Sequence, residues 1–293
     1  MYPSAEFRPL IRFGYFMAFL AALRLVVGFL PVPLKLLPVA TIIISIVFVV
    51  APIAALFAAA TYRWDRRAAI YTIVIGATTQ FLARNQALNP HLEPLTTGVY
   101  TALAQTGLIG WCLGLGALLV TALKDKNMIL PIAIFLGLFD IWLVFVPEGI
   151  AGQVARTNQA PLKALAYQVP KPAVEVQGGF AQPMLYIGPA DFLFMAMFFV
   201  ALYRFKMRTR KTGIAMAPTM AAYLLTVLIF HDTSIGPIRL GALPALVPIG
   251  LVVLGVNWKE FDMTKDEKQT TVAIFVIGVV LLAWRFWANR GAM

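Results

Sequence analysis

Apolar residues occur along this chain in runs that are close to the length of a membrane-spanning helix. Because an α-helix rises 1.5 Å per residue and the hydrocarbon core of a bilayer is about 30 Å thick, a span needs about 20 mostly apolar residues. The polar connections between the runs are short, except for residues 148–183. The pattern predicts an all-α, polytopic transmembrane helix bundle with about nine spans, at residues 10–30, 39–61, 68–82, 95–123, 128–147, 184–205, 214–230, 236–256 and 270–288.

Composition supports a membrane protein and excludes several other classes. Of the 293 residues, 60% are hydrophobic and 13% are charged, which is about half the charged fraction of a soluble domain. The net charge of +11 would suggest nucleic acid as the partner of a soluble protein, but in a membrane protein basic loops report orientation, so we expect no nucleic acid partner. The only cysteine, Cys112, lies in an apolar run, which excludes a disulfide scaffold.

The distribution of Lys and Arg predicts which ends of the helices face the cytoplasm, because short loops rich in these residues stay inside. We count 15 basic residues on the side of the N terminus and 8 on the opposite side. We therefore expect a multi-pass protein with a cytoplasmic N terminus, and with the long loop and the C terminus outside. The inner set is Arg8, Arg12, Arg63, Arg66, Arg67, Lys124, Lys126, Arg204, Lys206, Arg208, Arg210, Lys211, Lys259, Lys265 and Lys268, and the outer set is Lys35, Arg84, Arg156, Lys163, Lys171, Arg239, Arg285 and Arg290.

Two acidic residues lie within the expected spans, where an ionisable group is costly and marks a working site by default. Asp140 lies seven residues before the outer end of its span at Pro147, and Asp191 lies seven residues after the expected start of the next span at Met184. A rise of 1.5 Å per residue then puts both roughly 10 Å below the outer surface. Two consecutive antiparallel helices are therefore expected to present carboxyl groups at one level.

The surroundings of these acids indicate their protonation state. No Lys or Arg lies at that level in either helix, and two close carboxyl groups in a low dielectric hold one proton between them. An aspartyl protease uses this state: the carboxylate activates a water and the protonated partner donates to the carbonyl oxygen. The alternative is that each Asp binds a neighbouring backbone group or caps a helix break.

Two prolines, Pro244 and Pro248, are expected to interrupt the eighth span at the same depth. Proline removes a backbone donor and frees carbonyl groups, which a membrane tolerates only where protein or water covers them.

These three features together resemble the signature of the presenilin and signal peptide peptidase family of intramembrane aspartyl proteases. Phe139-Asp140 is similar to the family's Tyr-Asp, the segment from Gly188 to Asp191 to its Gly-x-Gly-Asp, and the segment from Pro244 to Leu246 to its Pro-Ala-Leu. The resemblance to signal peptide peptidases extends beyond the three motifs. It includes residues 154–163 and 169–171, which link the two acids, and residues 199–205, at the end of the second catalytic helix. In total it covers residues 130–256.

The chain departs from the family at two motif positions and in its helix count. Ala190 stands where the family has a second glycine, and Phe139 lacks the tyrosine hydroxyl. We expect four spans before the first catalytic helix, against five in the family, and one after the Pro-Ala-Leu helix, where the family has none.

The resemblance implies an intramembrane aspartyl endopeptidase of prokaryotic type, in a prokaryotic cell membrane, that acts on transmembrane segments or remnant signal peptides. Its expected parts are an N-terminal scaffold (1–125), a catalytic core (126–256) and an additional C-terminal helix (257–293). Two other functions stay open: a proton-coupled transporter or channel that uses the same two acids, and a scaffold that binds transmembrane segments without cutting them. The catalytic residues are expected to be Asp140 and Asp191, with substrate contacts from Phe139, Gly188, Pro189, Ala190, Leu243, Pro244, Ala245 and Leu246.

We expect no cofactor and no metal. His91 and His231, with Glu93 and Asp232 nearby, lack the helical i, i+4 spacing of a metal-binding pair. The remaining expectation concerns substrate engagement: residues 166–169 read as an extended run that ends at Pro170. A substrate strand is expected to pair with this run or with carbonyl groups freed near Pro244 and Pro248, and the loop is expected to be mobile until it does.

Overall fold

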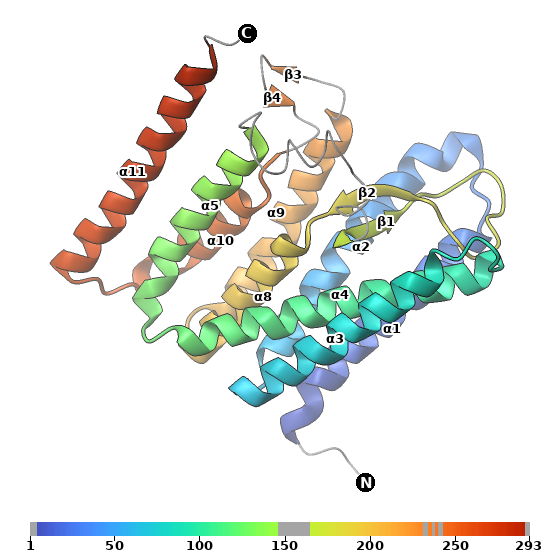
Figure 1. Cartoon of the computed structure of the whole chain (residues 1–293), viewed down its shortest axis with the longest axis horizontal. Coiled ribbons are helices and arrows are strands. Elements are labelled where there is room, and N and C mark those ends of the chain that lie inside the picture. Colours follow the sequence, from blue (N-terminus) through green and yellow to red (C-terminus); the bar gives the residue numbers. More distant parts are fainter. Residues whose placement is uncertain (1–4, 146–164, 231–233, 236–237, 240–242, 291–293) are drawn as a thin grey trace. The chain divides into compact units, whose positions relative to one another are not determined.

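The computed structural model describes residues 5–145, 165–230, 234–235, 238–239 and 243–290 (Figure 1). The chain divides into two compact units, which are described separately. Unit 1 comprises Met1–Ala122 and Lys163–Val200, and unit 2 comprises Leu123–Leu162 and Ala201–Met293. This division differs from the three consecutive segments expected from the sequence, since the hairpin before Asp191 belongs with the N-terminal helices and the C-terminal helix belongs with Asp140.

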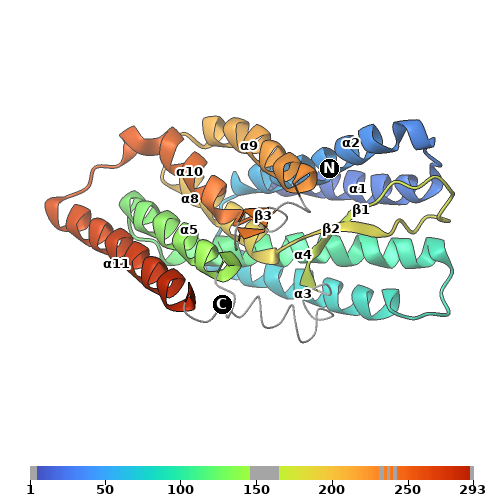
Figure 2. The same cartoon turned by 90° about the horizontal axis from the view of Figure 1, so that it is seen from above.

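Unit 1 consists of four long helices, a β-hairpin and most of a fifth helix (Figures 1 and 2). Glycines allow α3 and α4 to pack closely: a Cβ on Gly76 would lie 2.4 Å from the backbone nitrogen of Trp111, and one on Gly107 would lie 2.5 Å from that of Gln80. The elements are η1 (Ala5–Phe7), α1 (Arg8–Phe29), η2 (Leu34–Leu36), α2 (Leu37–Ala60), α3 (Arg66–Ala87), α4 (Pro94–Ala122), β1 (Tyr167–Pro170), β2 (Pro183–Ile187) and α8 (Pro189–Arg204).

The described residues of unit 2 form four long helices, the end of α8 and a second, shorter hairpin. Its helices α5 and α11 lie side by side and run parallel, as Figures 1 and 2 both show. Helix α11 begins with a capping box, in which the Glu267 carboxylate accepts the Thr264 N–H at 2.7 Å and the Thr264 hydroxyl accepts the Glu267 N–H at 3.3 Å. The elements are η3 (Lys126–Met128), α5 (Ile129–Phe145), α9 (Thr209–Ile229), β3 (Ser234–Ile235), β4 (Ile238–Arg239), α10 (Leu246–Asn257), η4 (Trp258–Glu260) and α11 (Lys265–Arg290).

A buried asparagine ties α9, α10 and the turn before α9 together. Asn257 donates to the Thr212 hydroxyl at 2.8 Å and to the Val253 carbonyl at 2.8 Å, and it accepts the Arg208 N–H at 3.0 Å. Its side chain is fully buried, so these bonds satisfy polar groups that would otherwise be costly to bury.

Within the described residues, six helical segments are long and apolar enough to cross a membrane. This confirms a helical, multi-pass membrane protein, and each of the nine expected spans overlaps one helix. Helix α3 is long but carries more polar residues, whereas α8 and α10 have only 16 and 12 residues. The six segments are Arg8–Phe29, Leu34–Ala60, Pro94–Ala122, Lys126–Val144, Thr209–Ile229 and Lys265–Arg285.

Two spans begin later than the sequence predicted. The expected helix from Met184 is instead the strand β2, and α8 begins at Pro189. The expected helix from residue 236 begins only at Leu246. Proline explains the second boundary in part, because a helix rarely continues through the residue that precedes proline, and Pro244 lies just before the first turn of α10. Pro248 does not interrupt the helix, since it occupies the first turn, where its missing N–H costs no hydrogen bond.

The expected extended run at residues 166–169 is confirmed. Strand β1 covers Tyr167–Pro170 and pairs antiparallel with β2, so that Tyr167 lies opposite Ile187 and Val169 opposite Leu185. The register shifts at Pro170, where proline cannot donate to the ladder.

Candidate functional site

The first acid, Asp140, contacts the Pro-Ala-Leu segment (244–246) directly. One carboxylate oxygen of Asp140 accepts the backbone N–H of Leu246 at 2.7 Å. Leu246 is the first residue of α10, so its N–H has no partner within the helix. The break in the helix at Pro244 therefore exposes a backbone donor, and Asp140 satisfies it.

Packing of α5 against α10 holds this contact in place. A Cβ on Gly250 would lie 3.3 Å from the Ala133 carbonyl, and the nearest atoms to Gly137 belong to Val247. On the other side, the Tyr223 hydroxyl of α9 donates to the carbonyl of Leu243, just before the Pro-Ala-Leu segment. Pro244, Ala245 and Leu246 are buried and Leu243 is half-buried. The segment is thus held by α5 at Leu246 and by α9 at Leu243.

The second acid, Asp191, lies in the first turn of α8 and not seven residues along a helix. This corrects the argument that placed both acids at one helical depth, because the preceding residues are extended. The Asp191 N–H donates to the Gly188 carbonyl at 3.2 Å. A Cβ on Gly188 would lie 3.6 Å from the Asp191 carboxylate, so this glycine leaves space next to the acid. An acid in a first turn is also favoured by the helix dipole.

Helix α4 supports the start of α8. The Cys112 thiol donates to the Pro189 carbonyl at 3.3 Å, and a Cβ on Gly116 would lie 2.7 Å from the Leu193 carbonyl. After Asp191, the ring of Phe192 is buried and meets the ring of Tyr167 edge-on, with centroids 5.1 Å apart. The position of Asp191 in unit 1 therefore depends on α4 and on strand β1.

Strand β1 is held by polar side chains from α1 and α4. The Gln168 N–H donates to the side-chain carbonyl of Gln105 at 2.9 Å, and the Arg24 guanidinium donates to the Gln168 carbonyl. Backbone groups of successive strand residues point to opposite edges. Gln168 therefore has both of its backbone groups occupied on the edge that faces away from β2. We call Arg24, Gln105 and Gln168 the β1 clamp.

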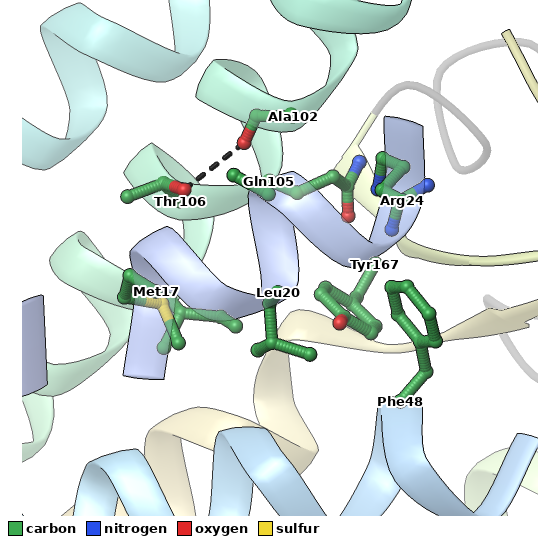
Figure 3. A pocket seen from close by; sticks show the side chains of 10 residues that line it. Met17, Leu20, Arg24, Phe48, Ala102, Gln105, Thr106 and Tyr167 are labelled. Carbon is green, nitrogen blue, oxygen red and sulfur yellow. Dashed lines mark hydrogen bonds between the residues drawn. The ribbon is translucent and has the colours of Figure 1, made fainter. Parts of the chain in front are cut away.

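Figure 3 shows the side chains of Arg24, Gln105, Tyr167 and Phe48 converging from three helices and β1. Arg24 is 4% exposed, its guanidinium lies 5.2 Å from the ring centroid of Phe48 and 5.8 Å from that of Tyr167, and it makes no ion pair with a described carboxylate. These rings and the Gln168 carbonyl provide the compensation that a buried cation needs. The space among them is about 10 Å³, which is enough for about one water.

The Tyr167 hydroxyl is buried beside Arg24 and forms no hydrogen bond of normal geometry with a described residue. Burial raises the pKa of Tyr167 to about 12, because desolvation disfavours the phenolate more than the nearby cation favours it. The residue is therefore a neutral phenol at all physiological pH values.

The described part of the long loop is attached to the end of α1. The Gly28 carbonyl accepts the N–H groups of Gln177 at 2.8 Å and Gly179 at 3.2 Å, and Val32 donates to the Ala173 carbonyl at 2.8 Å. Gly179 has φ of +93° and meets the Phe29 ring, a conformation that favours glycine. The expectation that this loop is mobile until substrate pairs with it stays a prediction.

The expected site residues fall into two groups. Asp140, Phe139 and the segment from Leu243 to Leu246 lie in unit 2, whereas Gly188, Pro189, Ala190 and Asp191 lie in unit 1. Ala190 is exposed, so its methyl group does not crowd the described residues. Phe139 is 40% exposed and stacks on Phe135 and Trp142, with centroids 5.9 and 5.8 Å away.

Several expected features lie outside the described residues: His231, Asp232 and the linking segment 154–163. Sequence reasoning missed the β1 clamp, although a buried arginine in an apolar helix is itself a signal. No group of three His, Cys, Asp or Glu side chains that could hold a metal occurs in the described part of the chain.

Comparison with known proteins adds no assignment. No family model, no curated protein and no solved structure matches the chain.

Proposed function

We propose that this protein is an intramembrane aspartyl endopeptidase in which Asp140 and Asp191 form the catalytic pair. The observation that carries the proposal is the hydrogen bond from the Leu246 N–H to the Asp140 carboxylate. It joins two of the three motifs that resemble the presenilin and signal peptide peptidase family, although they lie 106 residues apart in the sequence. The two units would supply one acid each.

The chemistry follows from the environment of the two acids. A carboxyl pair away from cations holds one proton, and in the described part of unit 2 Lys126 pairs with Asp262 and Arg208 pairs with Glu260. The ionised member would take a proton from water as the water attacks the peptide carbonyl, and the protonated member would donate to the oxygen that gains charge.

The backbone near both acids supports a substrate held in an extended form. A helical peptide bond is shielded by its own hydrogen bonds, so the enzyme must pair with a strand to expose it. The outer edge of β1 is occupied by the β1 clamp, which argues against our expectation that substrate adds there. We therefore propose that substrate adds along β2, which leads within four residues to Asp191, or along the Pro-Ala-Leu segment.

The topology we propose has nine spans, with α8 crossing together with β2, which precedes it, and α10 crossing together with the residues that precede it. At 1.5 Å per residue α8 is about 24 Å long, and five residues of β2 add about 16 Å. With the N terminus in the cytoplasm, the first catalytic helix runs outward, as in signal peptide peptidases. The substrates we propose are single-span proteins with a cytoplasmic N terminus, or remnant signal peptides.

The experiment is cleavage of a fluorogenic transmembrane peptide by the purified protein, compared with Asp191→Ala. We expect fragments whose new ends lie inside the apolar segment, and none from the variant. Cleavage by both proteins would identify a contaminating protease and reject the proposal. No cleavage by either, with acid-dependent proton flux in vesicles that both Asp→Ala variants lose, would favour the transporter.

A further inference from the structure

Helices α5 and α11 of unit 2 enclose an apolar groove of about 470 Å³. Its α5 wall is the stacked row Phe135, Phe139 and Trp142, and its α11 wall includes Leu281 and Leu282. Between the two walls Leu138 packs against Gly278, where a Cβ would lie 2.5 Å from the leucine side chain. We call this space the α5–α11 groove. Neither Asp140 nor Asp191 is among the residues that line it.

One end of the groove is polar and the other is not. Arg285 and Trp284 of α11 lie at the C-terminal end, at the level of Trp142. Tryptophan at the end of a spanning helix is typical of the headgroup level of a bilayer, and arginine there pairs with phosphate. The opposite end is formed by apolar side chains, including Phe135 and Ile274.

The dimensions of the α5–α11 groove favour an acyl chain over a transmembrane helix as its occupant. From Ile274 to Arg285 the groove follows 12 residues of α11, a rise of about 16 Å, which matches one leaflet of a hydrocarbon core about 30 Å thick. A helix about 11 Å in diameter and of that length would occupy about 1,500 Å³, three times the groove volume. An acyl chain therefore fits within the groove, whereas a transmembrane helix could insert no more than one face.

We propose that the α5–α11 groove is a binding site for one anionic phospholipid, with an acyl chain along the aromatic row of α5 and the phosphate at Arg285. Because Phe139 is adjacent in sequence to Asp140, the lipid borders the helix that carries this acid. The inference is independent of the proposed protease activity, because it concerns retention of lipid by the protein.

The test is native mass spectrometry of the full chain released from nanodiscs that contain equal amounts of phosphatidylglycerol and phosphatidylcholine. We expect the protein to retain phosphatidylglycerol preferentially, by about fivefold, the contribution of one cation near a headgroup. Arg285→Gln should remove this preference, Arg285→Lys should keep it, and Lys268→Gln, at the other end of the same helix, should leave it unchanged.

A second pair of variants tests the acyl chain. Leu281→Trp fills the groove and should lower total lipid retention, whereas Val280→Trp, next to it on the same helix but not among the residues that line the groove, should not. Equal retention of both lipids by the wild-type protein would overturn the proposal. So would unchanged retention in both Arg285→Gln and Leu281→Trp, or a second copy of the chain or a peptide found in place of lipid.

Discussion

Asp140 and Asp191 occupy different backbone settings in the two units. Asp140 lies within α5, and its carboxylate accepts an N–H from the broken start of another helix, α10. Asp191 lies in the first turn of its own helix, directly after a β-hairpin that α1 and α4 hold in place. The protein thus fixes one acid by a side-chain contact to a helix break and the other by fixing the chain that leads to it.

This difference predicts which changes should affect each acid. The position of Asp140 should depend on the Pro-Ala-Leu segment and not on the β1 clamp, whereas the position of Asp191 should depend on the clamp. Substitution of either acid should reduce cleavage the most, because both acids belong to the same proposed catalytic centre.

Asp140→Asn and Asp191→Asn should each reduce cleavage of a transmembrane peptide by at least about 10²- to 10⁴-fold, the usual contribution of a proton-transfer group. In the Asp140→Asn variant the new amide oxygen would still accept the Leu246 N–H, so the fold should persist. Initial rates with purified protein give the measurement, and Asp262→Asn, an exposed acid of unit 2, is the control. Activity above one tenth in either variant would remove that acid from the mechanism.

Pro244→Ala should lower cleavage by about 10- to 100-fold, because alanine permits α10 to extend backwards and to bond the N–H that Asp140 accepts. Pro218→Ala, inside α9 of the same unit, should change the rate by less than about twofold if α9 only supports the fold. Wild-type turnover by the Pro244 variant would show that the Pro-Ala-Leu segment has no catalytic role.

Arg24→Met should destabilise unit 1 by about 1–3 kcal/mol, since it leaves the buried Gln168 carbonyl without its charged donor. Arg12→Met, at an exposed position of the same helix, should change stability by less than about 0.5 kcal/mol. Denaturant unfolding in detergent gives both values. Equal stability of the two variants would mean that the β1 clamp does not hold the hairpin.

The smallest effect is expected at Tyr167, and only in alkali. An unfolded tyrosine ionises near pH 10, whereas the folded pKa is about 12. The raised pKa therefore contributes stability below pH 10, which is lost as the pH rises to 12, by at most about 2–3 kcal/mol. Tyr167→Phe lacks this group, so its stability should fall less than that of the wild-type protein between pH 10 and 12. If the stability of the two proteins fell equally between pH 10 and 12, Tyr167 would not be a buried phenol with a raised pKa.

The sequence predicts the helices well because hydropathy and length are local properties. It also identifies β1, because a short run that contains Tyr167 and Val169, which favour strands, ends at Pro170. It fails at β2, because Met184 to Ile187 are apolar and continue without a polar break into α8, so a strand and a helix look alike there. The depth argument for Asp191 failed for the same reason.

The contacts of the site were harder to predict than its motifs. That Asp140 meets the N–H of Leu246 depends on the packing of α5 against α10 through Gly137 and Gly250, which no single motif encodes. For the β1 clamp, Arg24 in an apolar helix is a local signal, but its partner is a backbone carbonyl 144 residues away, which no local pattern indicates.

The central claim is that acids carried by separate units meet in one catalytic centre, and cross-linking tests it directly. In a Cys112→Ala background, Asp140→Cys with Asp191→Cys should be joined by a short bifunctional thiol reagent, as detected by mass spectrometry of the linked peptides. Asp140→Cys with Asp262→Cys is the control pair and should not be joined. If a monofunctional form of the reagent labels residues 140 and 191 separately but the bifunctional form never links them, the two acids do not form a pair and the account is wrong.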